Sequence, residues 1–179
     1  GQYGAAIGSG DHGRDAGIIT ITGGTVMAYG DESAAIGGGQ VCPGAKVTVA
    51  GGKVTAISRR RGAGIGGGSN GSGGVQGGGT FTITGGTVTA EGLRGIDNAT
   101  IDGGSVKAVS TNGSAPIVPQ PTNSKGKNVY CVTAVREGSE GLANLKGLKD
   151  YGCKDIYLLD ENRLYLYLPN GKYNFSVNG

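Results

Sequence analysis

The chain is poor in the residues that build metal and redox sites. Its 179 residues include one His, one Met, three Cys and no Trp. No two Cys stand in a C-x-x-C spacing, and a single His cannot complete a Cys/His ligand set, so we expect no zinc site. No apolar run approaches the roughly 20 residues that a transmembrane helix needs, so we expect no membrane insertion.

The chain also lacks a strong excess of positive or negative charge. The formal net charge is +3, and acidic residues are interleaved with basic ones along the whole chain. A nucleic-acid-binding surface would need a basic stripe with interleaved aromatic residues, and no such stripe is present. We therefore expect no nucleic-acid partner.

Glycine is abundant, with 40 residues, and it is arranged in a repeat. A segment with a central Gly-Gly recurs four times, as ITGGTV, VAGGKV, ITGGTV and IDGGSV, at residues 21–26, 49–54, 83–88 and 101–106. Internal repeats of this kind are typical of solenoids. A second shared element precedes each copy and places an isoleucine every 29 to 31 residues, at Ile7, Ile36, Ile65 and Ile96. The repeating unit is therefore about 30 residues long.

The aligned copies separate into columns of one chemical type. Three columns are apolar in every copy, namely Ile21/Val49/Ile83/Ile101, Val26/Val54/Val88/Val106 and Ala28/Ala56/Ala90/Ala108. An alternate column is threonine in every copy, at Thr20, Thr48, Thr82 and Thr100. Because side chains alternate between the faces of a strand, apolar columns are expected to point inward and threonines outward. The pattern predicts an all-β fold, a three-sided parallel β-helix of about four coils with strands around Ile7, Ile21 and Val26. Right-handed winding is expected for parallel crossovers.

The composition divides the chain into three parts. Residues 1–109 carry the repeat, residues 110–127 are rich in Pro, Ser, Asn and Gly and are predicted to be a linker, and residues 128–179 hold most of the tyrosines. Alternating apolar residues predict a small β-rich C-terminal module, and Asn-Gly at 170–171 predicts a hairpin between the runs 164–168 and 173–177. We expect this module to dock on the end of the solenoid and cover its open edges.

Two cysteines lie in the C-terminal module. Cys131 and Cys153 either pair as a disulfide in an exported protein or remain free thiols, like Cys42 in the repeat region. The spacing does not choose between these alternatives.

Charged residues gather at one corner of the predicted coil. Asp31 and Glu32 are followed one coil later by the run Arg59, Arg60 and Arg61. Arg94 is expected at the same corner of the next coil, and Tyr29 lies just before the acidic pair. Two acids against four arginines leave a positive excess that would suit an acidic polysaccharide, with Tyr29 offering a face for a sugar ring. The alternative is that the acids and bases form ion pairs between coils, such as Glu32 with Arg60 or Arg61.

One loop combines carboxylates with the single histidine. Asp11, His12 and Asp15 lie between the predicted strands of the first coil. Asp11 and Asp15 are candidate ligands for calcium, which is the only cofactor the sequence suggests; a solvated loop is the alternative. The sequence contains no nucleophile elbow. Asp102 has Thr84 and not a second acid in the preceding coil, so paired carboxylates for glycoside hydrolysis are not predicted.

Three phrases resemble a family of known architecture. GAGIGGG at 62–68, FTITGGTVTA at 81–90 and LYLYLPNGKY at 164–173 resemble the glycine-rich right-handed β-helix surface proteins of gut and other anaerobic bacteria, which include carbohydrate-binding-domain proteins and adhesins. The resemblance implies a secreted or cell-surface protein that acts in adhesion or binds an acidic polysaccharide or host glycan without catalysis. Two alternatives stay open: a polysaccharide lyase-like enzyme with an unusual site, and a purely structural spacer.

Overall fold

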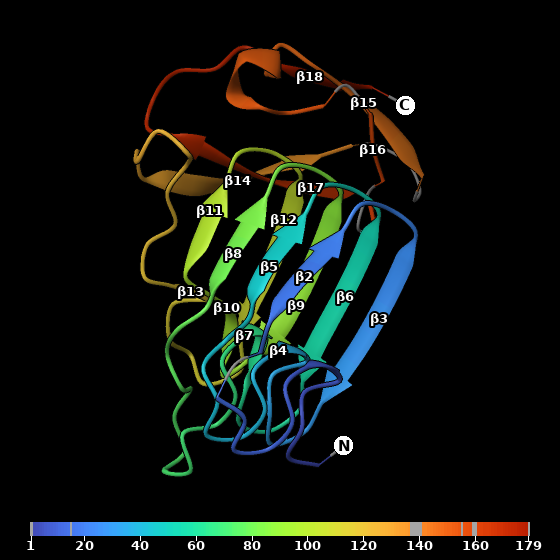
Figure 1. Cartoon of the computed structure of the whole chain (residues 1–179). Helices are drawn as coiled ribbons and strands as arrows, with labels where there is room; N and C mark the ends of the chain where they lie inside the picture. Colours follow the sequence, from blue (N-terminus) through green and yellow to red (C-terminus); the bar gives the residue numbers. More distant parts are fainter. Residues whose placement is uncertain (1, 15, 137–140, 155, 159–160, 179) are drawn as a thin grey trace.

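The computed structural model describes residues 2–14, 16–136, 141–154, 156–158 and 161–178. Three parallel sheets wind around a common core, and each turn of the chain, or coil, adds one strand to each sheet (Figure 1). The first sheet contains β1 (Ile7–Gly8), β4 (Ile36–Gly37), β7 (Ala63–Gly66), β10 (Arg94–Asp97) and β13 (Ile117–Val118). The second contains β2 (Ile18–Ile21), β5 (Lys46–Val49), β8 (Thr80–Ile83) and β11 (Ala99–Ile101). The third contains β3 (Thr25–Gly30), β6 (Lys53–Ser58), β9 (Thr87–Gly92) and β12 (Ser105–Ser110). The chain is the three-sided parallel β-helix that the repeat predicts.

The register of the sheets confirms the predicted columns. Thr20 is paired with Thr48, Thr48 with Thr82, and Thr82 with Thr100, all in parallel. The apolar columns lie in the core, where Val54 and Val88 are fully buried. Each β-branched side chain packs on the equivalent residue of the next coil, so burial of these columns is the main stabilising contribution.

The Gly-Gly corner between the second and third sheets explains why glycine is required there. Gly52 has φ = 84°, a left-handed conformation that L side chains rarely adopt. A Cβ atom on Gly52 would also lie 2.5 Å from the carbonyl oxygen of Gly24 in the preceding coil. The corner therefore needs glycine for conformation and for close stacking.

Residues 110–127, predicted to be a linker, contribute to the stack. β13 pairs in parallel with β10 and adds a fifth strand to the first sheet. Thr122 forms a parallel bridge with Thr100 and extends the threonine column of the second sheet. The Gly-Gly repeat does not extend into residues 110–127, so the sequence pattern did not predict this partial fifth coil.

The C-terminal module consists of two small antiparallel sheets. β14 (Val129–Val135) pairs with β17 (Arg163–Pro169), while β15 (Leu142–Lys146) pairs with both β16 (Ile156–Leu158) and β18 (Ser176–Asn178). A short 3-10 helix, η1, spans Lys149–Tyr151. The predicted hairpin through Asn170-Gly171 is wrong, because β17 and β18 belong to different sheets. β17 pairs with β14 and β18 pairs with β15, and the module has its own core around Leu145, Leu164 and Leu166.

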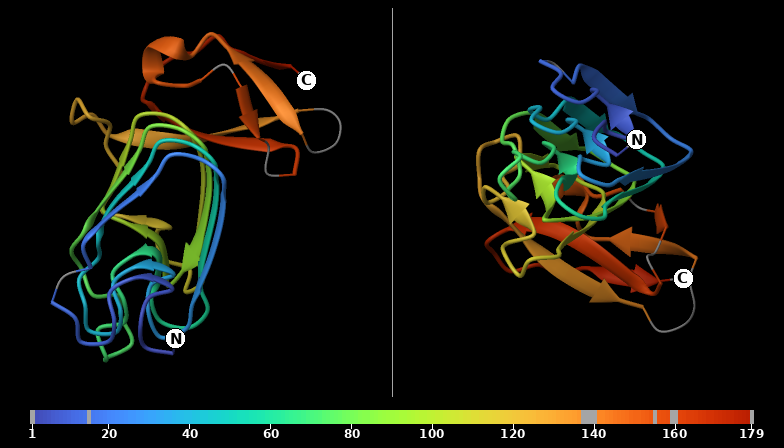
Figure 2. Two further views of the ribbon diagram at one scale, coloured as in Figure 1. Left: turned by 45° about the vertical axis from the view of Figure 1, so that its right-hand side comes forward. Right: turned by 90° about the horizontal axis from the view of Figure 1, so that it is seen from below.

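The module covers one end of the stack. In Figure 2 the first coil lies at one end, and the ribbon formed by β14 and β17 lies across the other end, beside the last coil. Val129 is part of the solenoid core, and Tyr167 packs against that core. The backbone N–H of Tyr165 donates to the hydroxyl of Ser105 at 3.0 Å, and Lys154 Nζ donates to the carbonyl oxygen of Ala50 at 3.0 Å. The predicted docking of the module on the solenoid is confirmed.

Cys42, Cys131 and Cys153, which all lie within the described residues, are not joined to one another in a disulfide. Cys42 and Cys153 are buried, whereas Cys131 is exposed on β14. Within the described ranges, no helix is both long enough and apolar enough to span a membrane.

Candidate functional site

The corner that joins the third sheet to the first sheet brings the predicted charges together. β3 ends at Gly30 and β6 ends at Ser58. The backbone hydrogen bonds between the two coils continue past both strand ends. The backbone N–H of Arg59 donates to the carbonyl oxygen of Gly30 at 3.1 Å, and the backbone N–H of Arg60 donates to the carbonyl oxygen of Asp31 at 3.1 Å. The stacking of two coils therefore positions the arginine run over the acidic pair. We call residues 29–32 and 59–61 the corner site.

Two of the three arginines in the corner site form ion pairs between coils. Nε of Arg60 lies 3.3 Å from Oδ1 of Asp31, and Nη1 of Arg60 lies 3.6 Å from Oε1 of Glu32. Nε of Arg61 lies 3.3 Å from Oε2 of Glu32. Glu32 therefore forms the ion pairs with Arg60 and Arg61 that the sequence predicted for stacked coils. Because the arginine side chains are half exposed or more, each pair contributes less than about 1 kcal/mol to stability.

Arg59 behaves differently from its neighbours. Its guanidinium carbon lies 5.4 Å from the centroid of the Tyr29 ring, in a cation–π contact. Among the described residues, no carboxylate forms an ion pair with Arg59. Asp31 and Glu32 neutralise two of the three arginines, so one positive charge of the corner site is left over, and Arg59 carries it.

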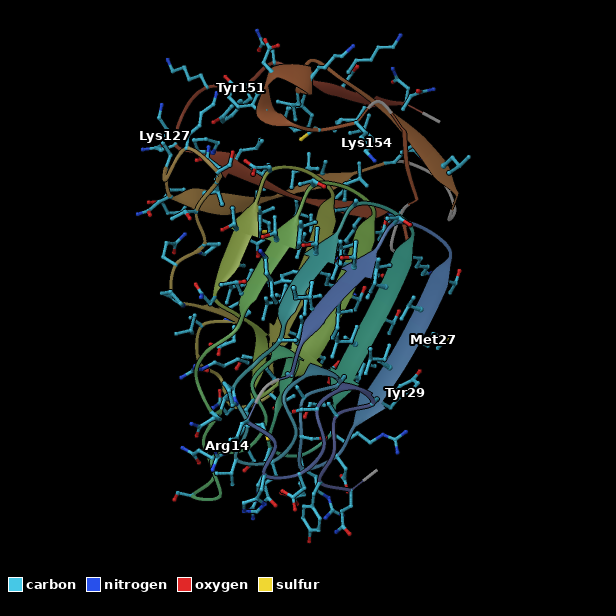
Figure 3. The ribbon with its side chains drawn as sticks, viewed as in Figure 1. Arg14, Met27, Tyr29, Lys127, Tyr151 and Lys154 are labelled. Atoms are coloured by element: carbon cyan, nitrogen blue, oxygen red, sulfur yellow. The ribbon has the colours of Figure 1, made fainter. Side chains whose placement is uncertain are left out.

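A surface depression adjoins this charge. Its volume is about 610 Å³, and it is lined by Gln2, Tyr29, Gly30, Asp31, Arg59 and Arg60. Figure 3 shows Tyr29 and Met27 along β3 at the outer edge of the stack, where no further strand of the described chain covers them. Tyr29 is 42 % exposed, so its side chain is accessible from this depression.

Arg94 does not belong to the corner site. It lies in β10, in register with Ala63 and not with an arginine. Its Nη1 donates to Oδ1 of Asp97 at 2.9 Å. The carboxyl of Asp97 is buried, and this burial raises its pKa despite the opposing effect of Arg94. The predicted excess of four arginines over two acids is wrong, because three arginines reach the corner and Arg94 has an acidic partner of its own.

The predicted calcium ligands are only partly described. Asp11 Oδ1 lies 2.7 Å from Nδ1 of His12. Asp15 lies outside the described residues. In the part of the chain that is described, no group of three or more His, Cys, Asp or Glu side chains could hold a metal ion. Calcium binding at Asp11 and Asp15 stays a prediction.

A second hollow lies between the last coil and the C-terminal module. Its volume is about 370 Å³, and it is lined by Ile101, Asp102, residues 123–125, Lys127, Val129, residues 150–152, Tyr167 and Pro169. No sequence signal pointed to this hollow, because its walls come from segments that are distant in the sequence and meet only when the module docks.

Comparison with known families supports the architecture. The model of the beta helix repeat family matches residues 19–40, 47–69 and 81–99. Each match begins within or beside a strand of the second sheet and continues through the third sheet to the first, so one match corresponds to about one coil. No curated protein and no solved structure matches the chain.

Proposed function

We propose that this β-helix is a non-enzymatic solenoid, secreted or displayed on a cell surface, that binds an anionic polysaccharide. The observation that carries the proposal is the position of Arg59, which lies on Tyr29 beside an open depression and has no carboxylate partner among the described residues.

The chemistry of this pair suits a uronic acid. A guanidinium presents two parallel N–H groups that match the two oxygens of a carboxylate. An aromatic ring offers an apolar surface for the C–H face of a sugar. Asp31 lies in the same depression, but Arg60 already neutralises it. We expect the binding at one site to be weak and to decrease as salt screens the charges.

The same depression lacks the groups for hydrolysis. Asp31 is its single lining acid among the described residues, whereas hydrolysis of a glycosidic bond ordinarily uses two carboxylates that face each other across the substrate. The proposed role is therefore attachment to an acidic polymer or host glycan. The resemblance to bacterial surface proteins supports the adhesive role and the extracellular location.

A pull-down on insoluble polysaccharides tests the proposal. The parent chain is incubated with cross-linked polygalacturonate and with cellulose, at low and at high salt. We expect retention on polygalacturonate at low salt only, and a clear loss of retention for Arg59→Ala. Arg14→Ala is the matched control, since it removes the same charge from an exposed loop elsewhere.

The outcomes separate the remaining functions. Equal retention of Arg59→Ala, Arg14→Ala and the parent would exclude the corner site. No retention on either polymer would favour a structural spacer. Release of unsaturated oligosaccharides from polygalacturonate during the incubation would show a lyase and overturn the non-enzymatic proposal.

A further inference from the structure

The hollow between the solenoid and the C-terminal module has the dimensions of a ligand site. We call it the junction pocket and define it by Asp102, residues 123–125, Lys127, residues 150–152 and Tyr167. Its volume of about 370 Å³ lies within the usual range of small-molecule sites, which is about 300–1,000 Å³. In Figure 3, Lys127 and Tyr151 lie on the same side of the molecule, where the module meets the stack.

The walls of the junction pocket are held in place by specific contacts. The backbone N–H and the hydroxyl of Ser124 both donate to Oδ1 of Asp102, each at 2.9 Å. The side-chain oxygen of Asn123 accepts from the backbone N–H of Lys125 and of Lys127, at 3.1 and 2.9 Å. These bonds order the turn before any ligand arrives, which lowers the entropy cost of binding.

The opposite wall is fixed by aromatic packing. The rings of Tyr151 and Tyr173 meet edge to face, with centroids 4.9 Å apart and planes at 82°. This contact holds the Tyr151 ring, yet 43 % of the residue is exposed. A held and accessible ring is the feature that a sugar needs for stacking.

The polar groups of the junction pocket balance in charge. Asp102, Asp150, Lys125 and Lys127 are the charged residues of the lining, so the formal sum is zero. Of the two carboxylate oxygens of Asp102, Oδ1 accepts the hydrogen bonds from Ser124. Oδ2 accepts no hydrogen bond from the described residues and is available to a ligand. Sugar hydroxyls donate and accept, so they suit a pocket that offers carboxylate acceptors and ammonium donors. An anion would gain from the lysines and lose to the two carboxylates.

We propose that the junction pocket binds a neutral hexose unit of a polysaccharide. The inference rests on the proposed function for the class of ligand, but it concerns a different site and a different charge. The corner site would take uronic acid units, and the junction pocket would take uncharged ones. A polymer that contains both kinds of unit could engage the two sites together and bind more tightly than at either alone.

Amide chemical shifts of the ¹⁵N-labelled full chain test this proposal by location. The probes are hexasaccharides of β-1,4-linked glucose, mannose and galactose, with hexagalacturonate as the charged comparison. We expect at least one neutral probe to shift the amides of residues 123–127 and 150–152. Absence of shifts with all three neutral probes, or shifts confined to other residues, would overturn the proposal.

Variants then assign the binding to the pocket. Tyr151→Ala and Asp150→Asn should each weaken binding of the neutral probe by about tenfold or more, through loss of the stacking surface and of an acceptor. Tyr3→Ala is the matched control, because Tyr3 is about equally exposed but lies in the first coil, away from the pocket. Unchanged affinity for both pocket variants would contradict the proposal.

The same titrations separate failure of this inference from failure of the proposed function. Arg59→Ala should abolish the shifts caused by hexagalacturonate and leave those caused by the neutral probe. Neutral binding without any effect of hexagalacturonate would support the junction pocket and reject the corner site. The reverse result would reject the junction pocket alone.

Discussion

The backbone of Gly152 lies directly against the carbonyl group of Asp102, with no room between them for a Cβ atom. Gly152 is the C-cap of η1 and has φ = 77°. Asp102 follows the last strand of the second sheet, so this contact joins the C-terminal module to the end of the solenoid. The junction pocket lies beside it.

This contact predicts that Gly152→Ala loosens the module. An alanine at this φ costs about 1 kcal/mol in backbone strain, and its Cβ would also overlap Asp102. Gly113→Ala is the matched control, because Gly113 has φ = 76° but open space where a Cβ atom would stand. We expect urea unfolding to show a clearly larger loss of stability for Gly152→Ala. Equal losses would mean that the backbone contact contributes nothing.

Substitutions in two adjacent strands of the same coil test the inward and outward columns. Val88 is fully buried, so Val88→Asp places a charge in the core and should prevent folding at a cost of several kcal/mol. Thr82 belongs to the outward column, and Thr82→Ala should cost less than about 1 kcal/mol. Thermal melts of the two variants decide the matter, and a parental melting temperature for Val88→Asp would refute the core assignment.

Removal of residues 128–179 tests the covering role of the module. The truncation removes Val129 and Tyr167, which pack on the core of the last coil. Val106 and Ile101 then become exposed, together with the unpaired edges of the last strands. We expect the truncated chain to aggregate, because open parallel edges pair with other chains. Light scattering after size-exclusion chromatography measures this. A monomeric truncation that melts like the parent would show that the two parts are independent.

The ion pairs of the corner site predict a gain of binding. Glu32 is the carboxylate partner of Arg61, whereas Arg60 also pairs with Asp31, so Glu32→Gln leaves one further arginine, Arg61, for an anionic ligand. We expect retention on polygalacturonate at low salt to increase, while stability falls by about 1 kcal/mol or less. Gln2→Glu, at the rim of the same depression, should act in the opposite direction. If both variants are retained on polygalacturonate to the same extent as the parent, the corner site does not bind through its charges.

The buried carboxyl of Asp97 predicts a specific dependence of stability on pH. Its pKa is raised above the ordinary value of 3.8 by burial, so the native state binds this proton more readily than the unfolded chain does. The stabilising contribution of the group is complete below about pH 4 and is lost as the pH rises through the native pKa. Between pH 4 and pH 7, the free energy of unfolding should therefore fall further, or rise less, for the parent than for Asp97→Asn. Asp150→Asn, at an exposed carboxyl, is the control and should follow the parent.

The repeat region could be predicted from the sequence alone. Strands that stack in parallel with zero offset place each residue on its equivalent in the next coil, so one-dimensional columns translate directly into sheets. Thr20, Thr48, Thr82 and Thr100 form a column in the sequence and a ladder in the structure for this reason. The pairing of Glu32 with Arg60 and Arg61 follows from the same stacking.

The tertiary structure alone decided the features that break this periodicity. In the C-terminal module the local turn signal Asn170-Gly171 does not form a hairpin, because β17 pairs with β14, which is distant in the sequence. Arg94 lies outside the predicted corner because the register of β10 places it beside Ala63, and its side chain bonds to the buried Asp97. The junction pocket required Gly152 to dock on Asp102, and a contact between unrelated segments leaves no pattern in either one. The sequence determined the solenoid through its repeat; long-range packing determined the end of the stack and the pocket beside it.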